Sequence, residues 1–450
     1  MNEITQCAEI GDERVPMHDV FSTGLHQRYM YTQSECSSGL STISSLSRYS
    51  LPYKLMHTQH LALDDVKQAL SVCACFVVTG LGAGLPLVYG LLEDNLELLF
   101  GSESASMGLQ RSRTSILIGA MQFASYFAVC RMAVWAQCRM GVRVMVALGA
   151  LATAGGLMAA SYAEQIWQLC LAYMLVGAGT SVSAHAASRP RVGAAGVGAA
   201  AVGVLWQHLA VYTSPGRALR WTALACAGTQ VLMVPFLFAP VWPASIEACS
   251  AKESLETRRP SDCGHAQAPS VLRLSVDWRQ AAGLFGLLLH SMMYLLPFVF
   301  LPGYVTTQLP VAHHLSAALP VSVIGLGMAV GGCSAQPLRI WSGMRPSVVR
   351  CGARLGLSLA VWCLWLPAGS SWGMVCGFSA VYGLCLGVAG DACVRNTWAN
   401  VAAVAGVAVG VPVGSWLFVG VGSGVYYMPL VTFTAAGLLL TAVCDAVSSA

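Results

Sequence analysis

The chain has 450 residues and a net charge of +4; 56% of its residues are hydrophobic and only 10% are charged. Soluble globular proteins carry about 25% charged residues, so this composition excludes a water-soluble domain. It predicts an all-α integral membrane protein in contact with a lipid bilayer, and nothing in it points to a nucleic-acid partner.

Residues 1–62 differ in composition from the rest of the chain. They contain six acidic residues, a Ser/Thr-rich stretch over 32–50 and no long apolar run. Such a segment cannot bury enough apolar surface to fold, so we predict a disordered cytoplasmic tail without a signal peptide. The alternative is a start codon assigned too early, because Met17, Met30 and Met56 could each begin the protein.

Twelve apolar segments follow, each near the roughly 20 residues that cross a bilayer core of about 30 Å. The N-terminal bundle, 63–240, is predicted to hold spans at 67–92, 113–134, 143–162, 166–187, 193–213 and 220–240. A polar stretch at 241–278 is predicted to be a cytoplasmic linker loop. The C-terminal bundle, 279–446, is predicted to hold spans at 279–301, 314–335, 347–367, 371–391, 399–420 and 425–446.

The distribution of basic residues sets the orientation. With both termini on the cytoplasmic side, 18 of the 24 Lys and Arg residues lie on cytoplasmic flanks and loops, Arg354 among them, and four lie outside. Cytoplasmic loops of membrane proteins are enriched in Lys and Arg, so this asymmetry favours twelve helices with both termini inside. We expect a multi-pass protein of the inner (cytoplasmic) cell membrane, and a monomer.

Motifs of enzymes and metal proteins are missing from the sequence. It has no CxxC pair, no HExxH and no Gly-x-x-x-x-Gly-Lys loop. The 17 cysteines are scattered through apolar runs, which is typical of cysteine used as a small hydrophobic residue. We therefore expect no enzymatic activity, no metal and no cofactor.

An internal repeat relates the two halves. Residues 85–89 match 296–300, and 141–143 match 343–345, at offsets near 200 residues. Gly196 and Trp206 match Gly406 and Trp416. Two like halves joined by a polar loop are typical of secondary transporters with a site between the repeats.

The loop between the second and third predicted spans carries Arg139, Gly141 and Arg143. Its stretch, 134–143, resembles the Gly-x-Leu-x-Asp-Arg-x-Gly-Arg-Arg motif of the major facilitator superfamily, although Val134 and Cys138 replace the family's Gly and Asp. The resemblance implies two six-helix bundles around a midplane cavity. It also implies a conformational latch at the three matching residues, which here lacks the usual carboxylate acceptor.

The repeat extends this latch to Gly343 and Arg345 in the second half. Asp391 is a candidate gate acceptor for the Arg345 loop; the alternative is a local ion pair with Arg395, four residues on. Residues 176–180 are similar to the family's pattern on the fourth span, but Tyr173 stands where the family has Arg. A proton-coupling role attached to that Arg does not carry over.

Few ionisable residues fall inside the predicted spans, and we expect no carboxylate at mid-membrane depth. A neutral or weakly charged solute is therefore predicted. His290 could bind a solute or couple its movement to protons, although a neutral histidine bonded to a helix carbonyl is the alternative. The candidate cavity residues are His290, Tyr294, Gln122, Tyr126, Tyr89, Tyr382, Gln207 and His208.

These expectations favour a secondary transporter that moves a small organic solute, with protons as a candidate coupling ion. Two alternatives remain open at this stage. The protein could export drugs or metabolites, or it could be a receptor or scaffold that keeps the transporter fold without transport.

Overall fold

The computed structural model describes residues 51–91, 111–186, 191–237, 278–309, 317–369, 371–390, 397–418 and 427–449, and these are almost entirely helical. The chain divides into two compact units, 1–65 and 66–450, and the second carries the membrane-spanning helices. The linker predicted at 241–278 lies outside the described residues, apart from Trp278. So do residues 1–50, but helix α2 begins at Leu51, inside the segment predicted as a tail.

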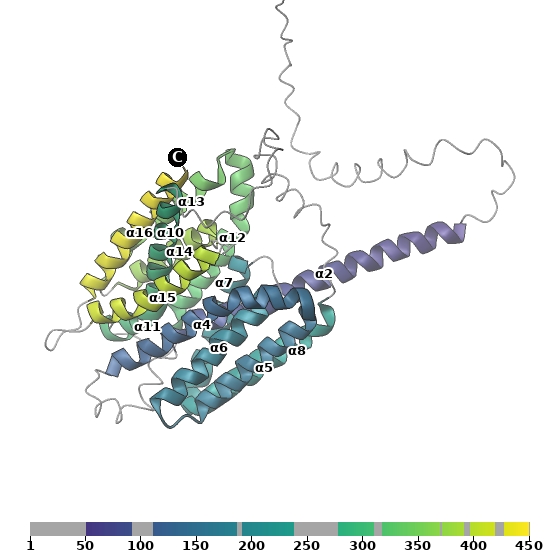
Figure 1. The fold of residues 1–450 in the computed structure, drawn as a ribbon, viewed down its shortest axis with the longest axis horizontal. Helices are drawn as coiled ribbons and strands as arrows, with labels where there is room; N and C mark the ends of the chain where they lie inside the picture. Colours follow the sequence, from purple (N-terminus) through teal and green to yellow (C-terminus); the bar gives the residue numbers. More distant parts are fainter. Residues whose placement is uncertain are drawn as a thin grey trace, which may run out of the picture. The chain divides into compact units, whose positions relative to one another are not determined.

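The helices of the N-terminal half, residues 66–237, are drawn in purple to teal in Figure 1. They are α2 (Leu51–Leu87), α4 (Arg111–Met140), α5 (Val142–Ser161), α6 (Ile166–Ala186), α7 (Arg191–Tyr212), α8 (Pro215–Met233) and the 3₁₀ turn η1 (Val234–Phe236).

The helices of the C-terminal half, residues 278–449, are drawn in green to yellow (Figure 1). They are α10 (Trp278–Met293), α11 (Leu296–Gln308), α12 (Ala318–Ser342), α13 (Pro346–Ala360), the π-helical turn η2 (Val361–Trp365), α14 (Trp372–Ala389), α15 (Thr397–Phe418) and α16 (Met428–Ser449).

Among the described residues, eleven helical segments are long and apolar enough to cross a membrane. They match eleven of the twelve predicted spans. The exception is 220–240, where α8 forms a helix of 19 residues that does not reach the same hydropathy. Arg217 and Arg220 in its first two turns and Gln230 near its end account for the difference. The chain is thus a multi-pass membrane protein, and the twelfth span stays a prediction.

Large apolar side chains on the outer faces of these helices support the same conclusion. Trp341 is 80% exposed, Ile340 74% and Trp416 69%. Lipid, unlike water, imposes no penalty on such faces. Small residues lie at the helix contacts instead, as is usual where helices pack within a bilayer.

The seventh predicted span is broken into α10 and α11. Pro297 follows the break and has no N–H with which to continue the helical ladder. Tyr294 N still donates to His290 O at 2.9 Å, and Val299 N resumes the pattern by donating to Leu295 O at 3.1 Å. The matching Pro86 lies near the end of α2, which stops at Leu87. Both halves of the repeat therefore interrupt a helix near this proline, after Pro86 in the first half and before Pro297 in the second.

The repeat is also visible in the backbone. Gly141, between α4 and α5, has φ +80°, and Gly343, between α12 and α13, has φ +61°. Positive φ is open to glycine at little cost, so both turns require this residue. The matched tryptophans differ in their burial, since Trp206 is 2% exposed whereas Trp416 faces outward.

Two seams join the halves: α7 packs on α12, and α4 packs on α15. In the first seam, a Cβ placed on Gly196 would meet Gly325 O and would lie 2.9 Å from both Ala329 N and Met328 Cβ. In the second, Cys130 Sγ donates to Asn400 Oδ1 at 3.1 Å. Glycine thus permits backbone-to-backbone contact along the first seam.

Candidate functional site

The packing between the halves differs at the two ends of the helices. We define the basic end as the end at which Arg139, Arg143, Arg339 and Arg345 lie. Away from it, the buried apolar residues of both halves form one continuous cluster, which includes Tyr89 and Trp206 of the first half and Phe298 and Trp365 of the second.

At the basic end, the described apolar residues form two separate clusters, one in each half. Ala74, Val78, Met145 and neighbours pack within the N-terminal half. The second cluster consists of Val349, Ala353, Val388 and Ala389. Among the described residues, and apart from the two seams, apolar packing therefore joins the halves away from the basic end, whereas at the basic end each half has its own cluster.

Two predicted residues of the N-terminal half, Tyr89 and Gln122, lie where the end of the first span meets α4 and α6. The Tyr89 ring lies 5.6 Å from the Tyr173 ring, edge to face. A Cβ on Gly119 would lie 2.5 Å from Tyr89 Cε1. Gln122, three residues further along α4, is 1% exposed, and neither end of its side-chain amide has a hydrogen-bond partner.

Tyr126 lies one turn from Gln122 and contacts a residue that the sequence analysis did not single out. Its ring lies 5.6 Å from the ring of His185, on α6. His185 Nδ1 lies 2.8 Å from Ser181 O, and both rings are half-buried. A search for i, i+4 polar pairs on this helix would have found Ser181 and His185.

The predicted residues of the C-terminal half also meet. His290 is 7% exposed and stacks on Tyr294, with ring centroids 5.3 Å apart. Tyr382, on α14, is fully buried and donates its hydroxyl to Tyr294 O at 3.0 Å. These contacts place the three residues at the break between α10 and α11. His290 Nδ1 has no hydrogen-bond partner there, so the alternative of a histidine bonded to a carbonyl finds no support at this nitrogen.

Arg354, which the sequence analysis counted on a cytoplasmic flank, has a buried side chain. The side chain is 2% exposed, inside α13, and its Nη1 lies 2.5 Å from Asp445 Oδ2 on α16. Asp445 is near the end of its helix, as expected, but its carboxylate points inward to this partner. Loop lengths alone could not reveal the pair, because it joins residues 91 positions apart.

Gln207 and His208 lie apart from the other candidates. His208 is exposed and its ring contacts Tyr212 on the same helix. The neighbouring Trp206 points into the protein instead and donates Nε1 to Leu91 O at 3.2 Å. The two predicted residues keep their status as predictions.

The predicted latch residues lie at the basic end. Arg143 Nε donates to Leu237 O at 2.8 Å and Nη2 to Pro235 O at 3.4 Å, both backbone carbonyls beyond α8. Arg139 is exposed over the Trp135 ring at 4.2 Å.

The second half repeats part of this arrangement. Gly343 ends α12 and donates its N–H to Arg339 O at 3.1 Å, and Arg345 directly precedes α13. Asp391, the proposed gate acceptor, lies outside the described residues.

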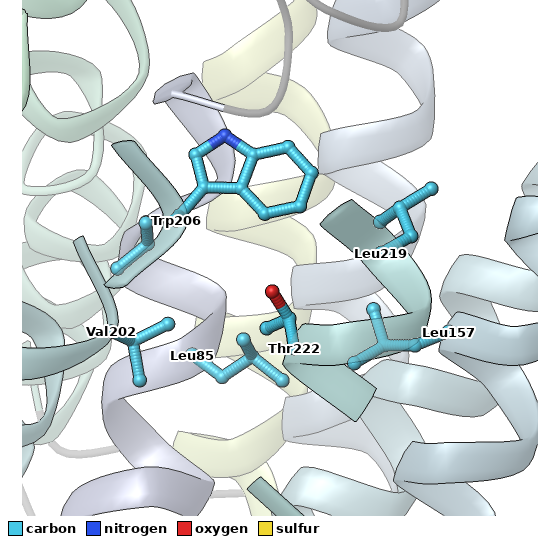
Figure 2. A pocket seen from close by; sticks show the side chains of 7 residues that line it. Leu85, Leu157, Val202, Trp206, Leu219 and Thr222 are labelled. Carbon is cyan, nitrogen blue, oxygen red and sulfur yellow. The ribbon is translucent and has the colours of Figure 1, made fainter. Parts of the chain in front are cut away.

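A narrow cleft lies inside the N-terminal half, with room for about one water molecule. Figure 2 shows its apolar lining, in which the Thr222 hydroxyl is the only side-chain oxygen among the labelled residues. The lining residues are Leu85, Val88, Leu157, Val202, Trp206, Leu219 and Thr222. Such a lining offers little to recognise a polar solute. Among the described residues, no group of three His, Cys, Asp or Glu side chains could hold a metal ion.

No protein-family model matches the sequence, and no curated protein matches it. Solved structures do match the fold. A D-xylose–proton symporter superposes with a TM-score of 0.59 at 11% identity, covering 84% of this chain and 97% of its own. The peptide transporter POT in complex with sulfate gives 0.56 at 14% identity, covering 84% and 94%. The chain therefore has the fold of major facilitator transporters, and its structural neighbours are transporters rather than enzymes.

Proposed function

We propose that this chain is a secondary transporter that moves a small, neutral or weakly charged organic solute between its two helix bundles by alternating access. The observation that carries the proposal is the packing asymmetry. One apolar cluster joins the halves away from the basic end, whereas two separate clusters occupy the basic end. Rocking the halves about the two seams would exchange the sealed end for the open one.

The seams suit such a movement because small residues bring the helix backbones into close contact there. Gly196 and Gly325 face each other in one seam, and a side-chain hydrogen bond joins Cys130 to Asn400 in the other. Helices that meet through small residues can slide or tilt without first withdrawing large side chains. The broken α10–α11 span supplies a second flexible point.

The polar groups near the interface favour a solute that forms hydrogen bonds without a full charge. Gln122 is buried with both amide atoms unpaired, which costs about 1–3 kcal/mol unless a partner arrives. A hydroxyl or amide on a solute would satisfy both atoms. Tyr126 and His185, half-buried one turn toward the basic end, add hydroxyl and imidazole groups along the same route.

Proton coupling is part of the proposal. One structural neighbour is a proton symporter of a neutral sugar, and histidine is the side chain whose ordinary pKa lies closest to physiological pH. The excess of Arg and Lys at the basic end supports the assignment of that end to the cytoplasm. We further propose that the protein acts as a monomer in the inner membrane.

The test is uptake by proteoliposomes that contain the purified full-length protein. Radiolabelled sugars, nucleosides, amino acids, dipeptides and vitamins would be tested with and without an inward proton gradient. We expect saturable uptake of one class, reduced at least tenfold in Gln122→Ala and unchanged in the matched surface variant Gln68→Ala, whose side chain is exposed on α2. If no class enters faster than into empty liposomes while the protein remains folded, the transport proposal fails and a receptor or scaffold role takes its place.

A further inference from the structure

Asp445 is the only acidic residue in the eleven candidate membrane spans. Its carboxylate, 16% exposed, lies on α16 and contacts the Arg354 guanidinium, 3% exposed, on α13 at 2.5 Å. An ionisable residue within a membrane span costs several kcal/mol and usually serves a function. This lone carboxylate therefore needs an explanation beyond packing.

Stability does not provide that explanation. Replacing a buried ion pair by apolar residues of similar size is often neutral or stabilising, because the cost of desolvating both charges offsets their attraction. A hydrophobic contact between α13 and α16 would hold the helices at least as well. Ser358, one turn further along α13, already joins them through a hydrogen bond to Ala435 O at 2.8 Å.

The third helix at this contact is α10. A Cβ on Gly286 would lie 2.8 Å from Cys444 Cβ and 3.9 Å from Asp445 Oδ1, so glycine brings the α10 backbone close to the carboxylate. One turn further on, the imidazole of His290 is buried within reach of the Arg354 charge, and its Nδ1 has no hydrogen-bond partner.

The other titratable and charged groups that face this site come from the same helices. They are Arg350 and Cys351 of α13 and Cys444 of α16. Asp445 is thus one carboxylate among two arginines, one histidine and two thiols, and it is the only anion in the group at neutral pH.

We propose that Asp445 is a proton-binding site whose occupancy is sensed through Arg354 and His290. In the proton-bound form a new O–H bond forms on the carboxylate, with the proton taken from water, and the Asp445–Arg354 pair changes from neutral to one net positive charge. Arg354 keeps its own proton and loses its anion. Release of the proton to water restores the ion pair, so no further reactant is required.

Two structural features connect this event to the rest of the molecule. The pair holds α13 to α16, and an unpaired buried guanidinium is costly enough to move toward other acceptors. His290 lies one turn before the break between α10 and α11, and α11 belongs to the cluster that seals the halves. A shift of Arg354 against His290 therefore acts on the helix that connects the open end to the sealed end. Coupling of this proton to solute movement rests on the transport function proposed above.

The test follows the carboxyl stretching band by infrared spectroscopy of the full-length protein in lipid nanodiscs between about pH 5 and 8. The wild type is expected to show a protonated carboxyl band that rises as the pH falls and is lost in Asp445→Asn. The matched control is Glu164→Gln, which removes an exposed acid in the turn between α5 and α6 and should leave that band unchanged. A band that persists in Asp445→Asn, or an Asp445 that stays ionised over the whole range, overturns the proposal.

Because Asp445→Asn leaves Arg354 without a partner, a second variant guards against loss of the fold. The double variant Arg354→Leu, Asp445→Leu removes both charges and should fold. It is expected to lose the titrating band and any pH-dependent change in distance between the halves; retention of either refutes the proton site. The outcome is independent of the uptake test, since Asp445 can titrate in a protein that transports none of the solutes, and uptake can occur without it.

Discussion

The contact between α7 and α12 offers a direct test of how the halves are joined. In Gly196→Ala, the new Cβ would meet Gly325 O and lie 2.9 Å from Ala329 N. Ordinary van der Waals contacts to Cβ begin near 3.4 Å, so the helices must separate by at least about 0.5 Å. Such overpacking typically costs about 1–3 kcal/mol.

The matched control is Gly155→Ala on α5, where a Cβ would meet nothing within 4 Å. Alanine is better than glycine in a helix by about 1 kcal/mol, so this variant should be at least as stable as the wild type. The two variants should therefore differ by about 2–4 kcal/mol in the free energy of unfolding. The assay is unfolding in mixed micelles with increasing sodium dodecyl sulfate. Equal stability of the two variants would refute backbone contact between the halves at this seam.

Three further predictions concern the stability of the same protein in the same assay. Ser358→Ala removes a buried hydrogen bond between α13 and α16 and should cost about 1 kcal/mol; no loss would argue against that contact. Arg143→Gln removes the bond to Leu237 O and should cost no more than about 1 kcal/mol because Arg143 is exposed, and a loss of several kcal/mol would show that the latch is a buried support. Asp445→Asn should cost more than Arg354→Gln, because a lone carboxylate can take up a proton whereas a lone guanidinium cannot be neutralised; the reverse order would contradict a charged buried pair.

Much of the fold was predictable because it depends on local properties. Hydropathy over about 20 residues locates eleven spans, and the matched glycines at 141 and 343 both take the positive φ that a tight turn requires. The sixth predicted span was the exception. Arg217 and Arg220 reduce the hydropathy of α8. This helix ends at Met233, whereas the predicted span, 220–240, continued through the apolar residues that follow.

The site was less predictable because it depends on contacts between helices distant in sequence. Hydropathy cannot show that Arg354 meets Asp445, or that α10, which carries His290, packs against α16. Helical spacing did group Gln122 with Tyr126 and His290 with Tyr294, since residues four apart share a face. Helical spacing failed to distinguish Trp206, which points inward, from its neighbours Gln207 and His208. The reason is that apolar residues lie on all sides of α7, so its sequence does not indicate which face is buried.

The most direct test of alternating access is to measure two distances in the same protein. One pair of spin labels would replace Met140 and Trp341 at the basic end, and a second pair would replace Tyr212 and Met428 at the opposite end; all four side chains are exposed. Labels would be attached through noncanonical residues, because the chain has 17 cysteines. Addition of the transported solute should shorten the distance at the basic end and lengthen the other in the same sample. If both distances stay fixed for every solute and pH while the protein remains folded, the two halves do not exchange access and the account is contradicted.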